Sequence, residues 1–195
     1  MPVTTPVRLA IIIGSTRPGR FAPTIARWAA EQADHYGFEL DLIDLAETGL
    51  PHELGDPSAE GRAAVAALST RLHRADAFLV LTPEYNHSFP APLKQAIDSF
   101  RPEWAAKPVA FVSYGGISGG LRAVEQLRLV FAELHATTIR NTVSFQNAGA
   151  RFDADGRPVD AADTNLAMKE MLHQLDWWAQ ALRTARATTP YGQNG

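Results

Sequence analysis

The chain has 195 residues, of which 46% are hydrophobic and 20% charged, so it suits one globular domain with a single large core. Its formal net charge of −3 gives no general attraction for nucleic acid or anionic lipid, and we expect neither as a partner. The absence of cysteine excludes disulfides, thiolate metal sites and thiol nucleophiles, and no stretch approaches the roughly 18 uninterrupted apolar residues of a membrane span. We therefore expect a soluble, cytoplasmic protein without a metal site.

Short β-branched runs alternate with segments of helical spacing along the chain. They predict strands at 7–13, 38–43, 76–82, 107–114 and 138–145, and helices at 22–36, 58–74, 90–99, 119–135 and 160–186. This alternation indicates an α/β three-layer sandwich with a parallel sheet in the middle. Five strands fit the flavodoxin-like order 2-1-3-4-5, whose ligand site lies beyond the carboxyl ends of the strands. We expect one domain over residues 1–187 and a disordered tail at 188–195.

The loop after the first strand, residues 14–20, carries features of an anion site. Its glycines permit close backbone approach, Ser15 offers a hydroxyl, and Arg17 and Arg20 supply planar, permanently charged donors. The following helix adds backbone N–H groups and the positive end of its dipole. The spacing matches neither a nucleoside-triphosphate loop nor a dinucleotide fingerprint, so a single terminal phosphate is the better ligand. The alternative is a polar turn with two solvated arginines.

The loops after the third and fourth strands predict a place for a flat ring. Residues 83–89 hold Tyr85 and Asn86 between prolines, and residues 115–120 contain four glycines. Such a run of glycines is costly unless the backbone must approach something closely. A proline-rich turn and a flexible hinge are the structural alternatives. Because strands one, three and four are neighbours in the predicted order, these loops and the phosphate loop would form one crevice of mononucleotide size.

At these motifs the chain resembles the NAD(P)H-dependent FMN reductase family, flavodoxin-like flavoproteins that include quinone, azo-dye and chromate reductases. The resemblance covers about two thirds of the chain, from the first strand to the fourth helix. It rests on residues 14–20, on residues 83–88 continuing to 93–98, and on residues 113–116. Two positions depart from the family pattern: Arg20 stands where many relatives have serine, and His87 where glycine is common.

The resemblance implies non-covalent FMN, with NADPH or NADH as co-substrate. Residues of the first loop would hold the phosphate, those at 83–86 would border the isoalloxazine, and the glycine loop would lie opposite. No side chain is assigned a catalytic role. The family also implies a homodimer or homotetramer with residues 85–97 near the subunit contact. The predicted cofactor-binding residues are Ser15, Arg17, Arg20, Pro83, Glu84, Tyr85, Asn86, Ser113, Gly115 and Gly116.

Three functions follow from these observations. The first is an FMN-dependent oxidoreductase that takes hydride from a nicotinamide and passes electrons to a quinone, an azo compound, free flavin or a metal oxyanion. The second is a flavodoxin-type electron carrier without pyridine-nucleotide turnover, which the modest charge of −3 disfavours because such carriers are usually strongly acidic. The third is a non-enzymatic binding module on the same fold.

Overall fold

The computed structural model describes residues 5–55 and 58–192, and its strands form a parallel sheet. The strands are β1 (Arg8–Ile13), β2 (Glu39–Asp44), β3 (Ala77–Pro83), β4 (Pro108–Gly115) and β5 (Thr137–Gln146). They are hydrogen-bonded in the order β2-β1-β3-β4-β5, and every neighbouring pair is parallel. The predicted flavodoxin-like order is therefore confirmed.

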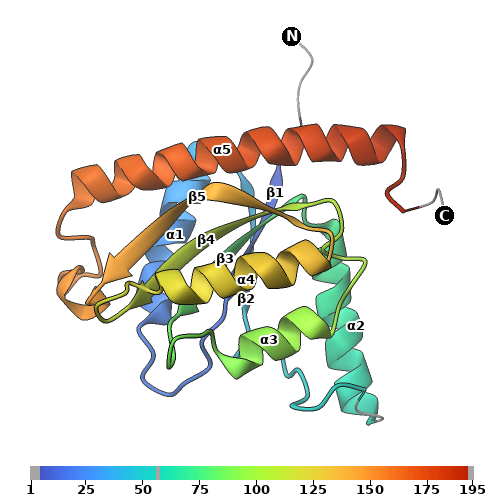
Figure 1. The fold of residues 1–195 in the computed structure, drawn as a ribbon, viewed down its shortest axis with the longest axis horizontal. Helices are drawn as coiled ribbons and strands as arrows, with labels where there is room; N and C mark the ends of the chain where they lie inside the picture. Colours follow the sequence, from blue (N-terminus) through green and yellow to red (C-terminus); the bar gives the residue numbers. More distant parts are fainter. Residues whose placement is uncertain (1–4, 56–57, 193–195) are drawn as a thin grey trace.

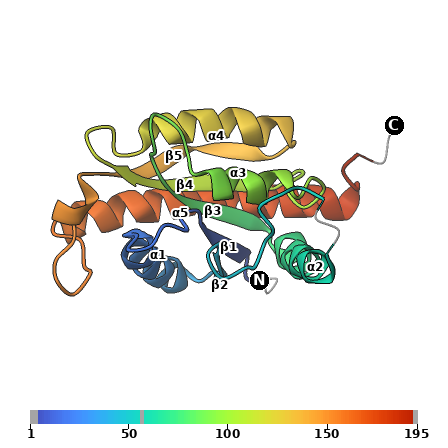
Figure 2. The same ribbon diagram turned by 90° about the horizontal axis from the view of Figure 1, so that it is seen from below.

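Helices cover both faces of the sheet (Figures 1 and 2). One core cluster joins α1 and α5 to inward residues such as Ile11 and Val112, and a second joins α2, α3 and α4 to residues such as Ile12 and Phe111. All seven residues of β3 are buried, which explains the continuous apolar run in the sequence. The helices are α1 (Ala22–Tyr36), α2 (Ala59–Arg74), α3 (Ala91–Asp98), α4 (Leu121–Glu133) and α5 (Ala161–Thr188), with a short 3-10 helix, η1 (Ala148–Ala150).

Local sequence signals set where these helices begin and end. Before α2, the Ser58 hydroxyl accepts a hydrogen bond from the Gly61 N–H at 3.0 Å, which satisfies one of the free donors of the first turn. After α1, Gly37 adopts a φ of 106° and donates its N–H to the carbonyls of Ala33 and Asp34. In the described part of the chain, no helix is both long and apolar enough to cross a bilayer.

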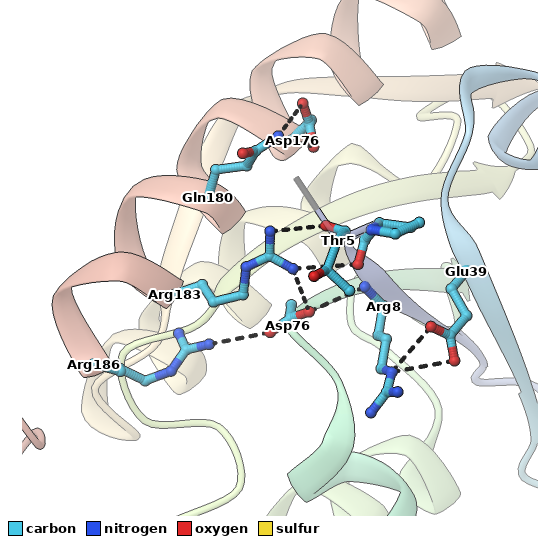
Figure 3. Close-up of polar contacts among 9 residues, drawn as sticks. Thr5, Arg8, Glu39, Asp76, Asp176, Gln180, Arg183 and Arg186 are labelled. Carbon is cyan, nitrogen blue, oxygen red and sulfur yellow. Dashed lines mark hydrogen bonds and ion pairs between the residues drawn. The ribbon is translucent and has the colours of Figure 1, made fainter. Parts of the chain in front are cut away.

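The long helix α5 is fastened at the amino ends of the strands by one carboxylate. Asp76 accepts a hydrogen bond from the Arg8 backbone N–H at 3.1 Å and forms ion pairs with Arg183 at 3.4 Å and Arg186 at 3.6 Å (Figure 3). Arg183 also donates to the carbonyls of residues 5 and 6. These contacts tie the last turns of α5 to β1 and to the residue before β3.

Part of the predicted tail, residues 188–192, lies within the described residues. Helix α5 continues through Thr188, and the Tyr191 hydroxyl lies 2.8 Å from Nδ1 of His135. Residues 193–195 lie outside the described residues. The division into one domain at 1–187 and a disordered tail at 188–195 stays a prediction.

Candidate cofactor site

A pocket of about 520 Å³ opens at the carboxyl ends of the strands. The loops after β1, β3 and β5 and the last two residues of β4 contribute to it, although they are far apart in the sequence. This is the position at which an open α/β sheet presents a ligand. The pocket is lined by Arg17, Arg20, Phe21, Pro83, Glu84, Tyr85, Tyr114, Gly115, Asn147, Ala148, Gly149 and Ala150.

The loop after β1 is held tightly against β3. The Gly14 N–H donates to the Leu81 carbonyl at 2.9 Å, and a Cβ on Gly14 would lie only 3.0 Å from that oxygen, so the position requires glycine. Ser15 is fully buried, and its hydroxyl lies 2.8 Å from the Tyr85 hydroxyl. Ser15 therefore fixes the Tyr85 ring at the edge of the pocket and is not itself part of the pocket lining.

The two arginines of this loop differ in their surroundings. Arg17 is exposed, and its guanidinium carbon lies 5.8 Å from the centroid of the Tyr85 ring, within cation–π range. Arg20 donates from Nη2 to Oδ2 of Asp44, the last residue of β2, and both side chains are only 15% exposed. This pair orients the Arg20 guanidinium. Its Nε is buried and has no hydrogen-bond partner among the described residues.

The loop after β3 is a tight two-residue turn. Tyr85 and Ser88 exchange backbone hydrogen bonds at 2.8 and 3.0 Å, and the residues between them, Asn86 and His87, have φ values of 49° and 72°. Such a turn requires positive φ at both central residues. From α4, Gln126 donates to the His87 carbonyl at 2.7 Å and accepts from the Ser88 hydroxyl. The turn is rigid, and it places Asn86 at an exposed tip outside the pocket lining.

Glu84 links this loop to the start of α4. Its carboxylate accepts hydrogen bonds from the Arg122 backbone N–H at 3.2 Å and from the Arg122 guanidinium at 3.1 Å. Burial raises the pKa of Glu84, but hydrogen bonds from Ser118 and Arg122 and the charge of Arg122 outweigh this, so its pKa lies below the usual value. The side chain is thus engaged with the first turn of α4, and Glu84 also lines the pocket.

The glycine loop after β4 is fastened to the sheet and is not a free hinge. The Ser113 and Ser144 hydroxyls both donate to the Gly119 carbonyl, at 2.9 and 2.8 Å. A Cβ on Gly119 would lie 2.3 Å from the Ser144 oxygen, and one on Gly120 would lie 2.7 Å from Cβ of Ser113. The close approach that the glycine run predicted is thus an approach to β4 and β5. Of the predicted binding residues here, Gly115 lines the pocket, Gly116 is exposed and Ser113 is buried beneath the loop.

The structure adds lining residues that the sequence did not single out. Tyr114, a residue only 7% exposed, forms part of the pocket wall, and the loop after β5 contributes residues 147–150. That loop begins at Asn147, which has a φ of 48° and donates its N–H to the Gly116 carbonyl at 3.1 Å. Asn tolerates this conformation better than most residues, so an Asn directly after the fifth strand was a usable signal.

The chemistry of the pocket favours a ligand rich in oxygen acceptors. Two of its lining residues, Arg20 and Tyr114, carry buried polar atoms without a partner among the described residues: a guanidinium N–H and a phenol hydroxyl. The first is a donor at all relevant pH values, and burial raises the pKa of the second, so that it also remains a donor. An FMN molecule, with a phosphate at one end and ring carbonyls at the other, fits this donor set.

Comparisons with known proteins agree with this reading of the site. Residues 7–150 match the protein family described as NADPH-dependent FMN reductase. The chain is 33% identical over 177 residues to an NADPH:quinone oxidoreductase of Arabidopsis thaliana, covering 87% of this chain and 90% of that protein. It is 32% identical over 171 residues to an NADPH azoreductase of Bacillus sp., covering 87% and 88%. Among solved structures, FerB, a flavoenzyme NAD(P)H:acceptor oxidoreductase of Paracoccus denitrificans, shares the fold with a TM-score of 0.73 at 24% identity, covering 89% and 98%.

Fold and site together define a flavodoxin-like protein with its ligand pocket at the carboxyl edge of the sheet. The chain belongs to the NADPH-dependent FMN reductase family, since the match to that family covers more than half of its length. It is an FMN-dependent oxidoreductase that uses NAD(P)H, and the class predicted from the loop motifs is confirmed.

Proposed function

We propose that the chain passes electrons from NAD(P)H, through FMN held in the pocket, to a quinone, an azo compound or free flavin. The observation that carries this proposal is one pocket, formed by the loops after β1, β3 and β5 and by the end of β4, whose unpartnered groups are donors. The quinone and azo acceptors are supported by the names of relatives that align with 87% of the chain.

The phosphate end of the cofactor would lie against the loop after β1. Arg17 is exposed at this wall, and Arg20 also lines it, with Nη2 held by Asp44 and a buried Nε that has no hydrogen-bond partner among the described residues. Two guanidinium groups beside a helix start form a strong site for a dianionic phosphate. Ser15 supports this site through Tyr85, because its hydroxyl is engaged with that phenol.

The ring end would lie between Pro83–Tyr85 and the glycine loop. Glu84 and Gly115 line the pocket at the ends of two adjacent strands, and the Glu84 N–H donates to the Tyr114 carbonyl at 3.0 Å. Asn86, Ser113 and Gly116 lie outside the lining and shape the segments that carry these two residues. A rigid frame of this kind orients a flat ring without an ordering cost at each turnover.

Bound FMN supplies the redox chemistry, accepting hydride from the nicotinamide and returning electrons to the acceptor. The residues of the chain bind and orient. Glu84, the carboxylate among the lining residues, is paired with Arg122 and its pKa is lowered, so it is poorly suited to act as a proton donor. We keep as part of the proposal that no side chain need act as acid or base in the hydride step.

We further propose a homodimer or homotetramer in the cytoplasm, where NAD(P)H is available. The segment at 85–97 is the proposed subunit contact, and its exposed, rigid turn at Asn86 and His87 supports this choice. A rigid surface loses little entropy on association. Sedimentation equilibrium of the purified protein tests the assembly, and a monomer at all concentrations would contradict it.

Anaerobic titration of the FMN-loaded protein with NADPH and, separately, NADH tests the activity. We expect the flavin absorbance to be lost with at least one nucleotide and to return on addition of a quinone. A protein that binds FMN but is reduced by neither nucleotide would be a flavodoxin-type carrier. A protein that takes up no FMN would be a binding module of another kind.

A further inference from the structure

Tyr114 lines the pocket, and its buried hydroxyl has no hydrogen-bond partner among the described residues. It is the penultimate residue of β4, and its ring packs in the core cluster shared with α1 and α5. Four buried side-chain atoms in the described part of the chain lack a hydrogen-bond partner, and the Tyr114 hydroxyl is one of them. The Ser15 hydroxyl acts on this phenol as a hydrogen-bonding group and lowers its pKa, but the two do not meet the geometry of a hydrogen bond, whereas Ser15 lies 2.8 Å from the Tyr85 hydroxyl.

A buried hydroxyl without a partner lowers the stability of the protein that contains it. The desolvation cost of such a donor is not repaid by any protein contact, and phenylalanine would fill the same space without that cost. A tyrosine at this position is therefore explained by a hydrogen-bond acceptor that is not part of the chain. Because the residue lines the pocket, that acceptor belongs to the pocket ligand.

The surroundings of the phenol show which part of a ligand it would contact. Burial raises the pKa of Tyr114 above its usual value and Tyr85 raises it further, while Ser15, Arg20 and Arg17 lower it to a lesser extent. Tyr85 lies in the loop after β3, and the other three groups that act on this hydroxyl, Ser15, Arg20 and Arg17, lie in the loop after β1. The phenol stays protonated beside two arginines, and Arg20 contributes the other unpartnered donor of the pocket.

We propose that the Tyr114 hydroxyl donates a hydrogen bond to a phosphate oxygen of FMN, forming one phosphate subsite with the Nε–H of Arg20. This assignment rests on the proposed binding of FMN in the pocket. Asp44 serves the subsite as a positioning residue, because its ion pair with Nη2 of Arg20 fixes the direction in which Nε points. The subsite thus draws on three separate strands of the sheet, β1 through its loop, β2 and β4.

The test uses Tyr114→Phe and compares FMN with riboflavin, which lacks the phosphate. Dissociation constants come from quenching of flavin fluorescence by the apoprotein. We expect FMN to bind about 10-fold more weakly to the variant, since a hydrogen bond to a charged acceptor is lost, and riboflavin to bind within about twofold of wild type. An unchanged FMN affinity would overturn the proposal, and so would an equal loss for both flavins, which would place the phenol at the ring.

A second readout separates this role from a structural one. Without ligand, the Tyr114→Phe apoprotein should melt at the same temperature as wild type or above it, because an unsatisfied hydroxyl has been removed. With FMN, its melting temperature should rise less than that of wild type. A clear drop in apoprotein melting temperature would show that the hydroxyl has a protein partner and would count against the proposal.

Tyr36→Phe is the matched control, because it deletes a phenol at the far end of α1, where the ring stacks on Phe38. It should leave both flavin affinities unchanged. If the wild-type protein binds riboflavin and FMN equally, the phosphate subsite is wrong while the flavin assignment stands. If it binds neither, the proposed function fails first and the subsite falls with it.

Discussion

At the amino ends of the strands, Asp76 is surrounded by donors, whereas at the carboxyl ends Arg20 and Tyr114 present donors that no described residue accepts. Lys107, also at the amino end, is 6% exposed and donates to the carbonyls of Leu72 and His73 at 2.8 and 2.9 Å. Glu103 is a partial exception, since one oxygen accepts from Ser69 at 2.6 Å while the other has no partner among the residues that the structure describes.

The polar side chains at the two ends of the sheet therefore have different roles. Satisfied charges at the amino end hold the last helix and the turn after α2 in place, as Figure 3 shows for Asp76. Unsatisfied donors at the carboxyl end lower stability and supply binding energy when a ligand provides the acceptors. Substitutions at the amino end should therefore change stability, and substitutions at the carboxyl end should change affinity.

The largest expected effect is at the carboxyl end. Arg17→Ala removes an exposed guanidinium from the phosphate wall and should weaken FMN binding about 100-fold, since a charge-assisted contact to a dianion is lost. Fluorescence titration of the apoprotein measures this. Arg74→Ala, an exposed arginine at the end of α2, is the control and should bind FMN as wild type does. Equal affinity of the two variants would contradict the assignment.

The corresponding substitution at the amino end is Asp76→Asn. It keeps the shape of the side chain but removes the charge that pairs with Arg183 and Arg186, and the carboxylate is only 16% exposed. We expect the free energy of unfolding to fall by about 2 kcal/mol, with FMN affinity unchanged. Urea denaturation measures the loss. Glu39→Gln, which breaks the exposed ion pair with Arg8, should cost no more than about 0.5 kcal/mol.

Lys107 makes the stability of the amino end depend on pH. Burial and, to a lesser degree, Arg186 lower its pKa to about 8, against the opposing charges of Asp76 and Glu103, from 10.5 in the unfolded chain. Above pH 8 the unfolded state therefore holds more protons, so the free energy of unfolding should rise with pH, by at most about 1.4 kcal/mol per pH unit. Below pH 8 the lysine is charged in both states and contributes no slope.

The measurement compares wild type with Lys107→Met by urea denaturation between pH 7 and about pH 9.5, below the range in which tyrosines of the unfolded chain ionise. We expect the stability of wild type relative to the variant to increase across the upper half of this range. Parallel pH profiles would show that the amine titrates as it does in an unfolded chain.

The strand order was predictable because the buried strands are nearly uniformly apolar and the helices between them are amphipathic. The loops that form the pocket follow from that order alone. By contrast, the role of a polar side chain in these loops depends on partners that are distant in sequence. The Ser15 hydroxyl contacts the Tyr85 hydroxyl, seventy positions away, and the Glu84 carboxylate accepts a hydrogen bond from Arg122. No local pattern marks such pairs.

Tyr114 shows the same limit of sequence-based prediction for a side chain that lacks a hydrogen-bond partner. Its position beside the glycine run was visible in the sequence, but the absence of a partner for its hydroxyl depends on how β1, β3 and β4 pack together. A tyrosine at the end of a buried strand is ordinarily read as a core residue with its hydroxyl satisfied by the protein. Only the tertiary structure distinguishes a phenol hydroxyl that has a hydrogen-bond partner in the protein from one that has none.

The smallest expected effect concerns backbone strain in the turn at the carboxyl end. His87 has a φ of 72°, a conformation that costs a residue with a Cβ about 1 kcal/mol and that glycine adopts freely. His87→Gly should therefore raise the free energy of unfolding by about 0.5 kcal/mol, because the strain relieved exceeds the extra entropy of the unfolded chain. Asn86→Gly is the control: its φ of 49° is one that Asn tolerates, so it should give no gain. FMN affinity of the His87 variant should equal that of wild type, since Gln126 holds the turn through the His87 backbone carbonyl. A loss of affinity would show that the imidazole itself contacts the ligand. His87 would then have to be added to the residues that bind FMN at the carboxyl end.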